Sequence, residues 1–320
     1  MKYFIGIDLG GMSAKAGLLD ENGNLLYVRR CETHAENDPV QTADDLSMLA
    51  KGLMEEAKIV EKDVVAVGIG SPGIIDSAAG SVVHWSNFAW KDVPLARLVQ
   101  EGTHLPVFVT NDANAAALGE AKYGSGAQYE DSVMITLGTG VGGGIVIGGK
   151  LFEGYRSAGG ELGHTVLKAG GVKCTCGRRG CFERYASATA LKRMTREAMV
   201  RNRDSRMWEL SPDIDNVSGR TAFDAARGGD RAARLVVKKY VTYLGEGIAN
   251  LVNLLRPQAV ILGGGVSNEG ENLLKPLRKV VRRNILAPES YAPLELVCAS
   301  LGNDAGIYGA AAYAMERTAE

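Results

Sequence analysis

The sequence has no excess of either charge and no long apolar run. Its 36 Lys and Arg residues balance 37 Asp and Glu residues, for a net charge of −1, and both signs are spread along the chain. A basic face for nucleic acid and an acidic tail are therefore not expected. No stretch reaches the roughly 18 apolar residues that a membrane span needs, so we expect a cytoplasmic protein whose partner is a small molecule.

Cysteine is scarce, and no low-complexity linker is visible. Five cysteines is an odd number, and three of them crowd together at Cys174, Cys176 and Cys181. This pattern favours a metal site over a disulfide framework, and Cys31 and Cys298 are expected to be ordinary buried thiols. The chain has 320 residues, 46% of them hydrophobic, which is enough for two domains.

Glycine, by contrast, is abundant. The chain has 41 glycines, nearly double the usual share of about 7%. Several of them punctuate apolar runs, and the alternation predicts an α/β protein. Residues 2–30 predict three antiparallel strands with turns at Gly10-Gly11 and Glu21-Asn22-Gly23. The other predicted elements are a helix at Asp44–Val60, buried strands at Val64–Gly70 and Val107–Thr110, and an alanine-rich helix at Asn111–Tyr123.

The opening of the chain recurs later. Ile7-Asp8-Leu9-Gly10 is matched about 128 residues further on by Ile135-Thr136-Leu137-Gly138, each between apolar strands. The repeat predicts two related domains that face one another. A third glycine turn, Gly263-Gly264-Gly265, follows the apolar run Ala259–Leu262, and a long core-facing helix is expected before Pro257.

Glycine turns of this kind can bind phosphate through successive backbone amides, and three of them suit a nucleotide. Gly138 to Gly143 formally matches the dinucleotide fingerprint, but Ile145-Val146-Ile147 predicts a strand where that site needs a helix. Gly144 to Lys150 approaches a Walker A loop, yet Leu151 replaces the required Ser or Thr. The remaining interpretation is that each strand-turn-strand unit binds phosphate, and that Asp8 holds a magnesium ion through the water shell of the ion. The alternative is that the turns merely join hairpins.

His164, Cys174, Cys176 and Cys181 form a one-histidine, three-cysteine set that suits tetrahedral zinc. Four protein ligands close the coordination sphere, so we expect a structural metal rather than one that activates water. Gly177 and Gly180 allow the tight reversal between the ligands. Unpaired cysteines in a loop are the alternative. A closed site would also bring Glu161 and Glu183 together, where they could bind sugar hydroxyls, although either glutamate alone would more often be a solvated surface residue.

Together these motifs resemble the ROK family of sugar kinases and sugar-responsive repressors, over essentially the whole chain. The resemblance rests on Asp8-Leu9-Gly10-Gly11, Ser71-Pro72-Gly73, Asn111-Asp112-Ala113-Asn114, Gly138-Thr139-Gly140-Val141-Gly142, Glu161-Leu162-Gly163-His164 and the segment Cys174–Glu183. It implies two actin-like, ribonuclease-H-like α/β domains with the active site in the cleft between them. The expected domains are 1–115, with the helix at 304–320 packing back on it, and 116–303, which carries the zinc loop.

The resemblance also implies residue roles. From the residues alone, Asp112 would be the N-cap of the alanine-rich helix; the family pattern makes it the catalytic base. The implied sugar ligands are Gly73, Asn87, Asn111, Asp112, Glu161, His164 and Glu183. The implied ATP and Mg²⁺ contacts are Asp8, Gly10, Gly11, Met12, Ser13, Lys15, Gly138, Thr139, Gly140 and Gly142, with Gly263, Gly264 and Gly265 at the adenosine. Met12 departs from the family, which usually has threonine there, and Ser13 is the nearest hydroxyl.

The sequence therefore predicts an ATP-dependent hexose kinase of carbohydrate metabolism, most similar in pattern to glucokinases that make glucose 6-phosphate in glycolysis. N-acetylmannosamine, N-acetylglucosamine, mannose and fructose are alternative substrates. A homodimer or higher homo-oligomer with structural Zn²⁺ is expected. A repressor of the same family would need a DNA-binding helix-turn-helix, for which no room is expected before the first strand at residue 2. A non-catalytic sugar-sensing protein is the third hypothesis.

Overall fold

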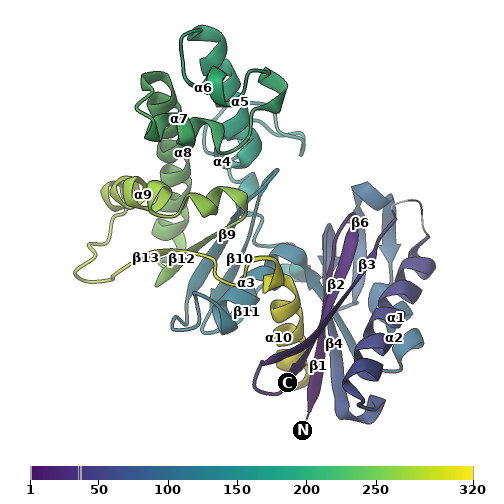
Figure 1. Ribbon diagram of the computed structural model, residues 1–320. Coiled ribbons are helices and arrows are strands. Elements are labelled where there is room, and N and C mark those ends of the chain that lie inside the picture. The colour runs from purple at the N-terminus through teal and green to yellow at the C-terminus, as the bar shows by residue number, and fades with distance from the viewer. Residues whose placement is uncertain (1, 35, 37, 320) are drawn as a thin grey trace. The chain divides into compact units, whose positions relative to one another are not determined.

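A computed structural model of the chain describes residues 2–34, 36 and 38–319. The described part contains two five-stranded mixed sheets and one three-stranded sheet (Figure 1). The first sheet has the order β3-β2-β1-β4-β8, with β1 antiparallel to β2 and parallel to β4. Its strands are β1 (Tyr3–Leu9), β2 (Ser13–Asp20), β3 (Leu25–Glu32), β4 (Val64–Ser71) and β8 (Val107–Asn111).

Two tight turns join the three antiparallel strands, as the sequence predicts. Between β1 and β2 the amide of Gly10 donates to the carbonyl of Ser13 at 3.0 Å, so that Asp8 pairs with Lys15 across the hairpin. Between β2 and β3 the carboxylate of Asp20 accepts hydrogen bonds from the amides of Asn22 and Asn24, both at 2.9 Å. A short acidic side chain that binds its own turn in this way fixes the strand register.

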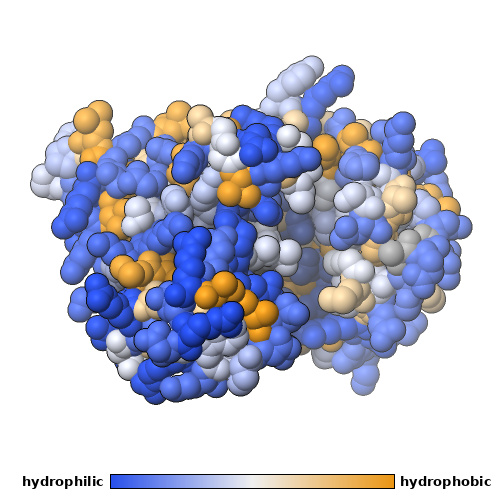
Figure 2. Space-filling view, turned by 90° about the horizontal axis from the view of Figure 1, so that it is seen from above, coloured by the Kyte–Doolittle hydropathy of each residue, from blue (hydrophilic) through white to orange (hydrophobic). Residues whose placement is uncertain are grey.

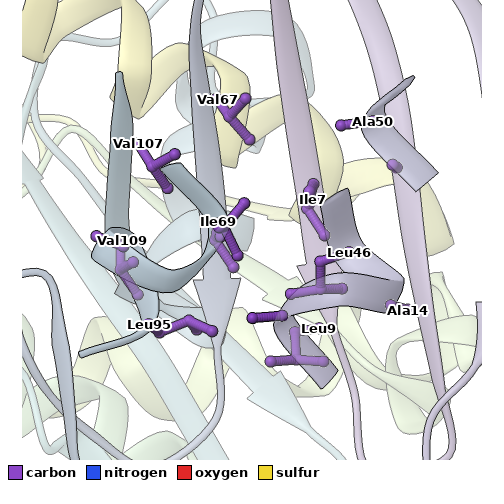
Figure 3. Packing of buried hydrophobic residues seen from close by; sticks show 14 of the residues in the cluster. Ile7, Leu9, Ala14, Leu46, Ala50, Val67, Ile69, Leu95, Val107 and Val109 are labelled. Carbon is purple, nitrogen blue, oxygen red and sulfur yellow. The ribbon is translucent and has the colours of Figure 1, made fainter. Parts of the chain in front are cut away.

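Helices cover both faces of the first sheet, because alternate residues of each strand point to opposite sides. On one face, Ile7 and Leu9 of β1 pack with Leu46 of α1 (Pro39–Ala57) and Leu95 of α2 (Leu95–Thr103) (Figure 3). On the other face α10 (Ala305–Ala319) lies against β1 and β4 (Figure 1).

Two glycines permit the close approach of α10. A Cβ on Gly6 would lie 1.9 Å from the carbonyl oxygen of Ile307, and one on Gly68 would lie 1.8 Å from that of Ala310. Neither position has room for a side chain, since real Cβ atoms do not approach other atoms so closely. The helix therefore packs directly on the backbone of the two central strands.

The helix expected at Asp44–Val60 begins earlier than the sequence predicts. In the structure α1 spans Pro39–Ala57, and the carboxylate of Asp38 accepts a hydrogen bond from the amide of Gln41 at 2.8 Å. Aspartate followed by proline is a strong helix start, because proline tolerates the first helical position and aspartate satisfies a free amide. The Asp38-Pro39 pair is the signal that periodicity alone missed.

The second sheet repeats the strand, glycine turn and strand of the first. Its order is β11-β10-β9-β12-β13. The strands are β9 (Ser132–Leu137), β10 (Val141–Ile147), β11 (Lys150–Phe152), β12 (Ala259–Gly263) and β13 (Glu295–Cys298). Because a strand follows Gly140 where a dinucleotide site would have a helix, the structure agrees with the rejection of that fingerprint.

The third sheet is a meander of β5 (Ile74–Asp76), β6 (Ser81–Trp85) and β7 (Trp90–Val93). The remaining α-helices are α3 (Asp112–Tyr123), α4 (Glu183–Ala186), α5 (Ala188–Arg201), α6 (Met207–Leu210), α7 (Thr221–Arg227), α8 (Arg231–Leu255) and α9 (Glu271–Asn284). The helix expected before Pro257 is α8, whose Tyr240, Leu244 and Ile248 are fully buried.

By its contacts the chain divides into two compact units. Unit 1 comprises 1–132, 144–160 and 300–320, and unit 2 comprises 133–143 and 161–299. Unit 1 is thus assembled from three separate parts of the chain. The domain boundaries expected from the sequence, 1–115 with 304–320 and 116–303, stay a proposal.

Hydrophilic residues predominate on the face seen in Figure 2, and hydrophobic ones lie among them in small groups. Within residues 2–34, 36 and 38–319, none of the helices has both the length and the apolar character that crossing a membrane requires.

Candidate functional site

The junction of β8 and α3 places Asn111 and Asp112 at the start of a helix in unit 1. Asn111 is the N-cap, and its side-chain oxygen accepts from the amides of Ala113 at 2.9 Å and Asn114 at 3.3 Å. Asp112 is the first helical residue. The expectation from the residues alone, that Asp112 is the cap, is therefore wrong. The carboxylate of Asp112 also accepts from the amide of Ala113, at 2.8 Å, but the residue that caps the helix is Asn111.

Asp8 lies at the end of β1 and interacts electrostatically with Asp112. The pKa of Asp8 is raised to about 6, mainly by burial and then by the like charge of Asp112, while Lys15 on the neighbouring strand opposes the shift. Lys15 itself forms an ion pair with Asp304. Two carboxylates in mutual repulsion offer the hard oxygen ligands that Mg²⁺ prefers. The residues present therefore fit the expected magnesium ion, which would be held at Asp8.

One contact joins two of the predicted sugar ligands of unit 1, and a third ligand lies near the first glycine turn. The side-chain amide of Asn111 donates to the carbonyl of Gly73 at 3.2 Å. Gly73 has a φ of +98°, and a Cβ there would lie 2.4 Å from the carbonyl oxygen of His84, so this position requires glycine. Asn87 approaches the first glycine turn, with its Nδ2 atom 3.8 Å from the position of a Cβ on Gly11.

Thr33, which follows β3, makes two hydrogen bonds to the first glycine turn, Gly10 to Ser13. The hydroxyl of Thr33 donates to the carbonyl of Gly10 at 2.8 Å, and its amide donates to the carbonyl of Met12 at 3.1 Å. The side chain of Met12 is 85% exposed. The methionine that departs from the family pattern therefore leaves the backbone of the turn intact. Sequence reasoning missed Thr33, because its role depends on β3 returning beside the turn.

The second glycine turn, Gly138-Thr139-Gly140 in unit 2, lies beside Glu183. The amide of Val141 donates to Glu183 Oε2 at 3.3 Å, and a Cβ on Gly140 would lie 2.2 Å from that oxygen. The start of α5 holds the other side of the turn, since Thr189 Oγ1 donates to the carbonyl of Thr139 at 2.7 Å. Gly142 lies within β10.

The third glycine turn packs against the end of β9. Gly264 has a φ of +80°, and a Cβ there would lie 2.7 Å from backbone atoms of Leu137, next to Gly138. Gly263 ends β12, and Gly265 borders a cavity of about 260 Å³. The other lining residues, which the sequence analysis did not single out, are Arg220, Arg227, Asn268, Glu269 and Asn272.

The four predicted metal ligands come together in unit 2. Their ligand atoms, from His164, Cys174, Cys176 and Cys181, all lie within 4.8 Å of one another. The distance from His164 Nδ1 to Cys174 Sγ is 3.8 Å, and that from Cys176 Sγ to Cys181 Sγ is 3.7 Å. A tetrahedral zinc ion with bonds of about 2.0–2.3 Å requires separations of this size. The cluster therefore fits a zinc site.

The chain around the cluster positions Glu183 but leaves Glu161 at the surface. Gly180 has a φ of +84°, and a Cβ there would lie 1.8 Å from the carbonyl oxygen of Lys168, which agrees with the predicted tight reversal. Glu183 Oε1 lies 3.6 Å from Cys174 Sγ. Glu183 thus links the metal loop to the second glycine turn. Glu161 is exposed and precedes the short helical turn that carries His164.

Comparisons with known proteins agree with this architecture. A family model described as ROK family matches residues 4–317. The chain is 40% identical over 314 residues to a glucokinase of Thermotoga maritima, covering 98% of this chain and 97% of the relative. It is 38% identical over 313 residues to a glucokinase of Halalkalibacterium halodurans, covering 96% and 93%.

A solved structure gives the same result for the fold. The ROK family glucokinase from Streptomyces griseus, solved in complex with glucose and AMPPNP, has a TM-score of 0.80 at 37% identity, and the match covers 98% of this chain and 99% of the other. The predicted actin-like, ribonuclease-H-like α/β fold is thereby confirmed. With a family model over nearly the whole chain and relatives of this similarity, the chain belongs to the ROK family.

Proposed function

We propose that this protein is an ATP-dependent hexose kinase that phosphorylates glucose at O6. The observation that carries the proposal is the pair formed by Asp8 and Asp112, which combines a carboxylate suited to magnesium with a carboxylate at a helix start. The similarity to glucokinases, one of them solved with glucose and an ATP analogue, supports the substrate.

In the proposed reaction Asp112 accepts the proton of the attacking sugar hydroxyl as that oxygen bonds to the γ-phosphorus of ATP and the bond from this phosphorus to the leaving ADP breaks. Such a base contributes roughly 10²–10⁴-fold, and phosphoryl transfer needs little beyond positioning and charge neutralisation. Asn111 would hold a neighbouring hydroxyl while it caps α3. Bound magnesium would supply charge neutralisation on the phosphates, with Asp8 as its protein contact.

The remaining predicted contacts complete the proposal. Glu161, His164 and Glu183 would bind sugar hydroxyls beside the zinc site, with Gly73 and Asn87 as further sugar contacts. The turns that begin at Gly10 and Gly138 would bind phosphates through backbone amides, and the turn at Gly263 would bind the adenosine. The cytoplasmic location and the homodimer or higher oligomer remain part of the proposal, the latter testable by light scattering.

The test is an ADP-release assay with glucose, mannose, fructose, N-acetylglucosamine and N-acetylmannosamine. We expect the highest kcat/KM for glucose, and a different preferred sugar would replace glucose in the proposal. Turnover of none of the five, with sugar binding retained, would instead identify a non-catalytic sugar sensor.

Asp112→Asn tests the base directly. We expect the variant to bind sugar as the wild type does and to lose about 10²–10⁴-fold in kcat. The control is Asp44→Asn on α1, an exposed aspartate outside the site, which should leave turnover unchanged. Substantial activity in the Asp112 variant would remove Asp112 from the role of base.

A further inference from the structure

Glu153, which no motif singled out, collects three side-chain hydrogen bonds in unit 1. Its Oε1 atom accepts from the hydroxyl of Ser77 at 2.7 Å and from that of Thr110 at 2.8 Å. Its Oε2 atom accepts from the hydroxyl of Tyr313 at 2.9 Å. Thr110 and Tyr313 are buried. Hydrogen bonds to an ionised acceptor are roughly twice as strong as those between neutral groups. The carboxylate of Glu153 therefore fixes the positions of the three hydroxyl groups that donate to it.

Local structure fixes where Glu153 points. It directly follows β11, and Gly154 after it has a φ of +70°, which turns the chain sharply. The carbonyl of Glu153 accepts from the amide of Gly159 at 2.8 Å and closes the loop between them. Ser157 in that loop accepts from the amide of Ser77 at 3.3 Å, which adds a second link to the same donor segment.

The two donors to Oε1 belong to elements that carry predicted sugar contacts. Thr110 is the β8 residue just before Asn111 and Asp112. Ser77 follows β5, in the hairpin of β5 and β6 that starts beside Gly73. The bond from Asn111 to the carbonyl of Gly73 already joins the same two elements. Glu153 therefore provides a second cross-link between the end of β8 and this hairpin.

The third donor, Tyr313, belongs to α10, and its phenol also makes a side-chain hydrogen bond with Ser77. Burial and the neighbouring Glu153 charge hold the pKa of Tyr313 well above its usual range, so the phenol keeps the proton that it donates. The bond at Oε2 ties the carboxylate to the helix that covers the sheet. Oε1 of Glu153 thus binds the hairpin and β8, whereas Oε2 binds α10.

We propose that Glu153 is a positioning residue that sets the distance between the sugar-binding hairpin and the strand end that carries Asp112. The inference rests on the proposed function. Its physical basis is that a misplacement of about 1 Å between a base and its substrate can cost about 10²-fold in rate. With Glu153 in place, the hydroxyl to be phosphorylated is held within reach of the base.

Variants of the three donors separate positioning from stability. Thr110→Val and Ser77→Ala each remove one bond to Oε1, and we expect each to lower kcat by about 10-fold or more with the KM for ATP unchanged. Tyr313→Phe is the matched control, because it removes the bond at Oε2 and the contact of the phenol with Ser77 but leaves both bonds to Oε1 in place. It should lower the melting temperature and leave kcat within about two-fold of the wild type.

Substitution of Glu153 itself completes the test. Glu153→Ala should lower kcat by about 10–100-fold. Glu153→Gln should restore it to within a few-fold, because the amide oxygen accepts from both hydroxyls and the amide nitrogen can donate to the tyrosine oxygen. If the alanine variant loses thermal stability but keeps kcat, or if the glutamine variant is as slow as the alanine variant, the proposal is overturned.

Amide hydrogen exchange of residues 74–85 gives a readout that needs no turnover. We expect the amides to exchange several-fold faster in Glu153→Ala and Thr110→Val than in the wild type. In Tyr313→Phe we expect their exchange rate to be unchanged. Unchanged exchange in the first two would refute the cross-link, whatever the activity. A wild-type protein that phosphorylates no sugar would refute the proposed function separately.

Discussion

Replacing Asp8 by asparagine should stabilise the metal-free protein while it abolishes magnesium-dependent catalysis. Asp8 is partly buried at the end of β1 and shares its surroundings with Asp112. Its carboxylate is therefore costly to ionise without a cation. Asparagine keeps the shape of the side chain and removes the charge, so the cost disappears together with the magnesium contact.

The pKa of Asp8 gives the size of the effect. It is raised from 3.8 to about 6 in the folded protein, and each pKa unit corresponds to about 1.4 kcal/mol. The folded state holds this proton more tightly than the unfolded state does. The stabilisation that comes from binding this proton to Asp8 is therefore fully present below about pH 4 and is lost as the pH rises through about 6. At pH 7.5 the asparagine variant should be more stable by about 3 kcal/mol.

Urea unfolding of both proteins in EDTA at pH 4.5, 6 and 7.5 would measure this difference. We expect it to be small at pH 4.5 and largest at pH 7.5. Added magnesium and nucleotide should raise the stability of the wild type at pH 7.5, because cation binding favours the ionised carboxylate, and should raise that of the variant much less. A variant that is no more stable than the wild type at pH 7.5, or a difference that does not change with pH, would show that burial of the charge is not costly.

Two further predictions concern the metal loop and the close packing of α10. Removal of zinc by a chelator should lower the melting temperature and make the buried thiols of Cys174 and Cys181 reactive toward thiol reagents. It should also weaken sugar binding. An unchanged sugar affinity in the metal-free protein would show that the metal does not organise the sugar site. Gly309→Ala should destabilise unit 1 by more than about 3 kcal/mol, because its Cβ would lie 1.6 Å from the carbonyl oxygen of Ala115, whereas Gly219→Ala meets open space and should unfold like the wild type.

Local patterns in the sequence predicted the elements that local chemistry decides. The glycine turns after Leu9 and Leu137, the strand at β4 and the spacing of the metal ligands each depend on residues near one another in the chain. Apolar periodicity predicts the start of α1 too late, because the Asp38-Pro39 pair begins the helix before the periodic residues do.

Long-range roles were not predictable in the same way. Thr33 and Glu153 act through residues brought to them by the sheet, and neither stands in a recognisable pattern. Asparagine and aspartate both cap helices well, so the sequence could not decide between Asn111 and Asp112. Only the backbone direction at the end of β8 does so.

The direct contact of α10 with β1 and β4 has a consequence for synthesis on the ribosome. The face of the first sheet that holds Phe4, Leu19 and Ala66 packs with Ala311 and Ala314, which are translated long after the strands that they cover. At about 5–20 residues per second, the roughly 200 residues after β8 take about 10–40 s to make. During that interval the first sheet lacks one of its covering layers, and chaperones have an apolar surface to bind until α10 emerges.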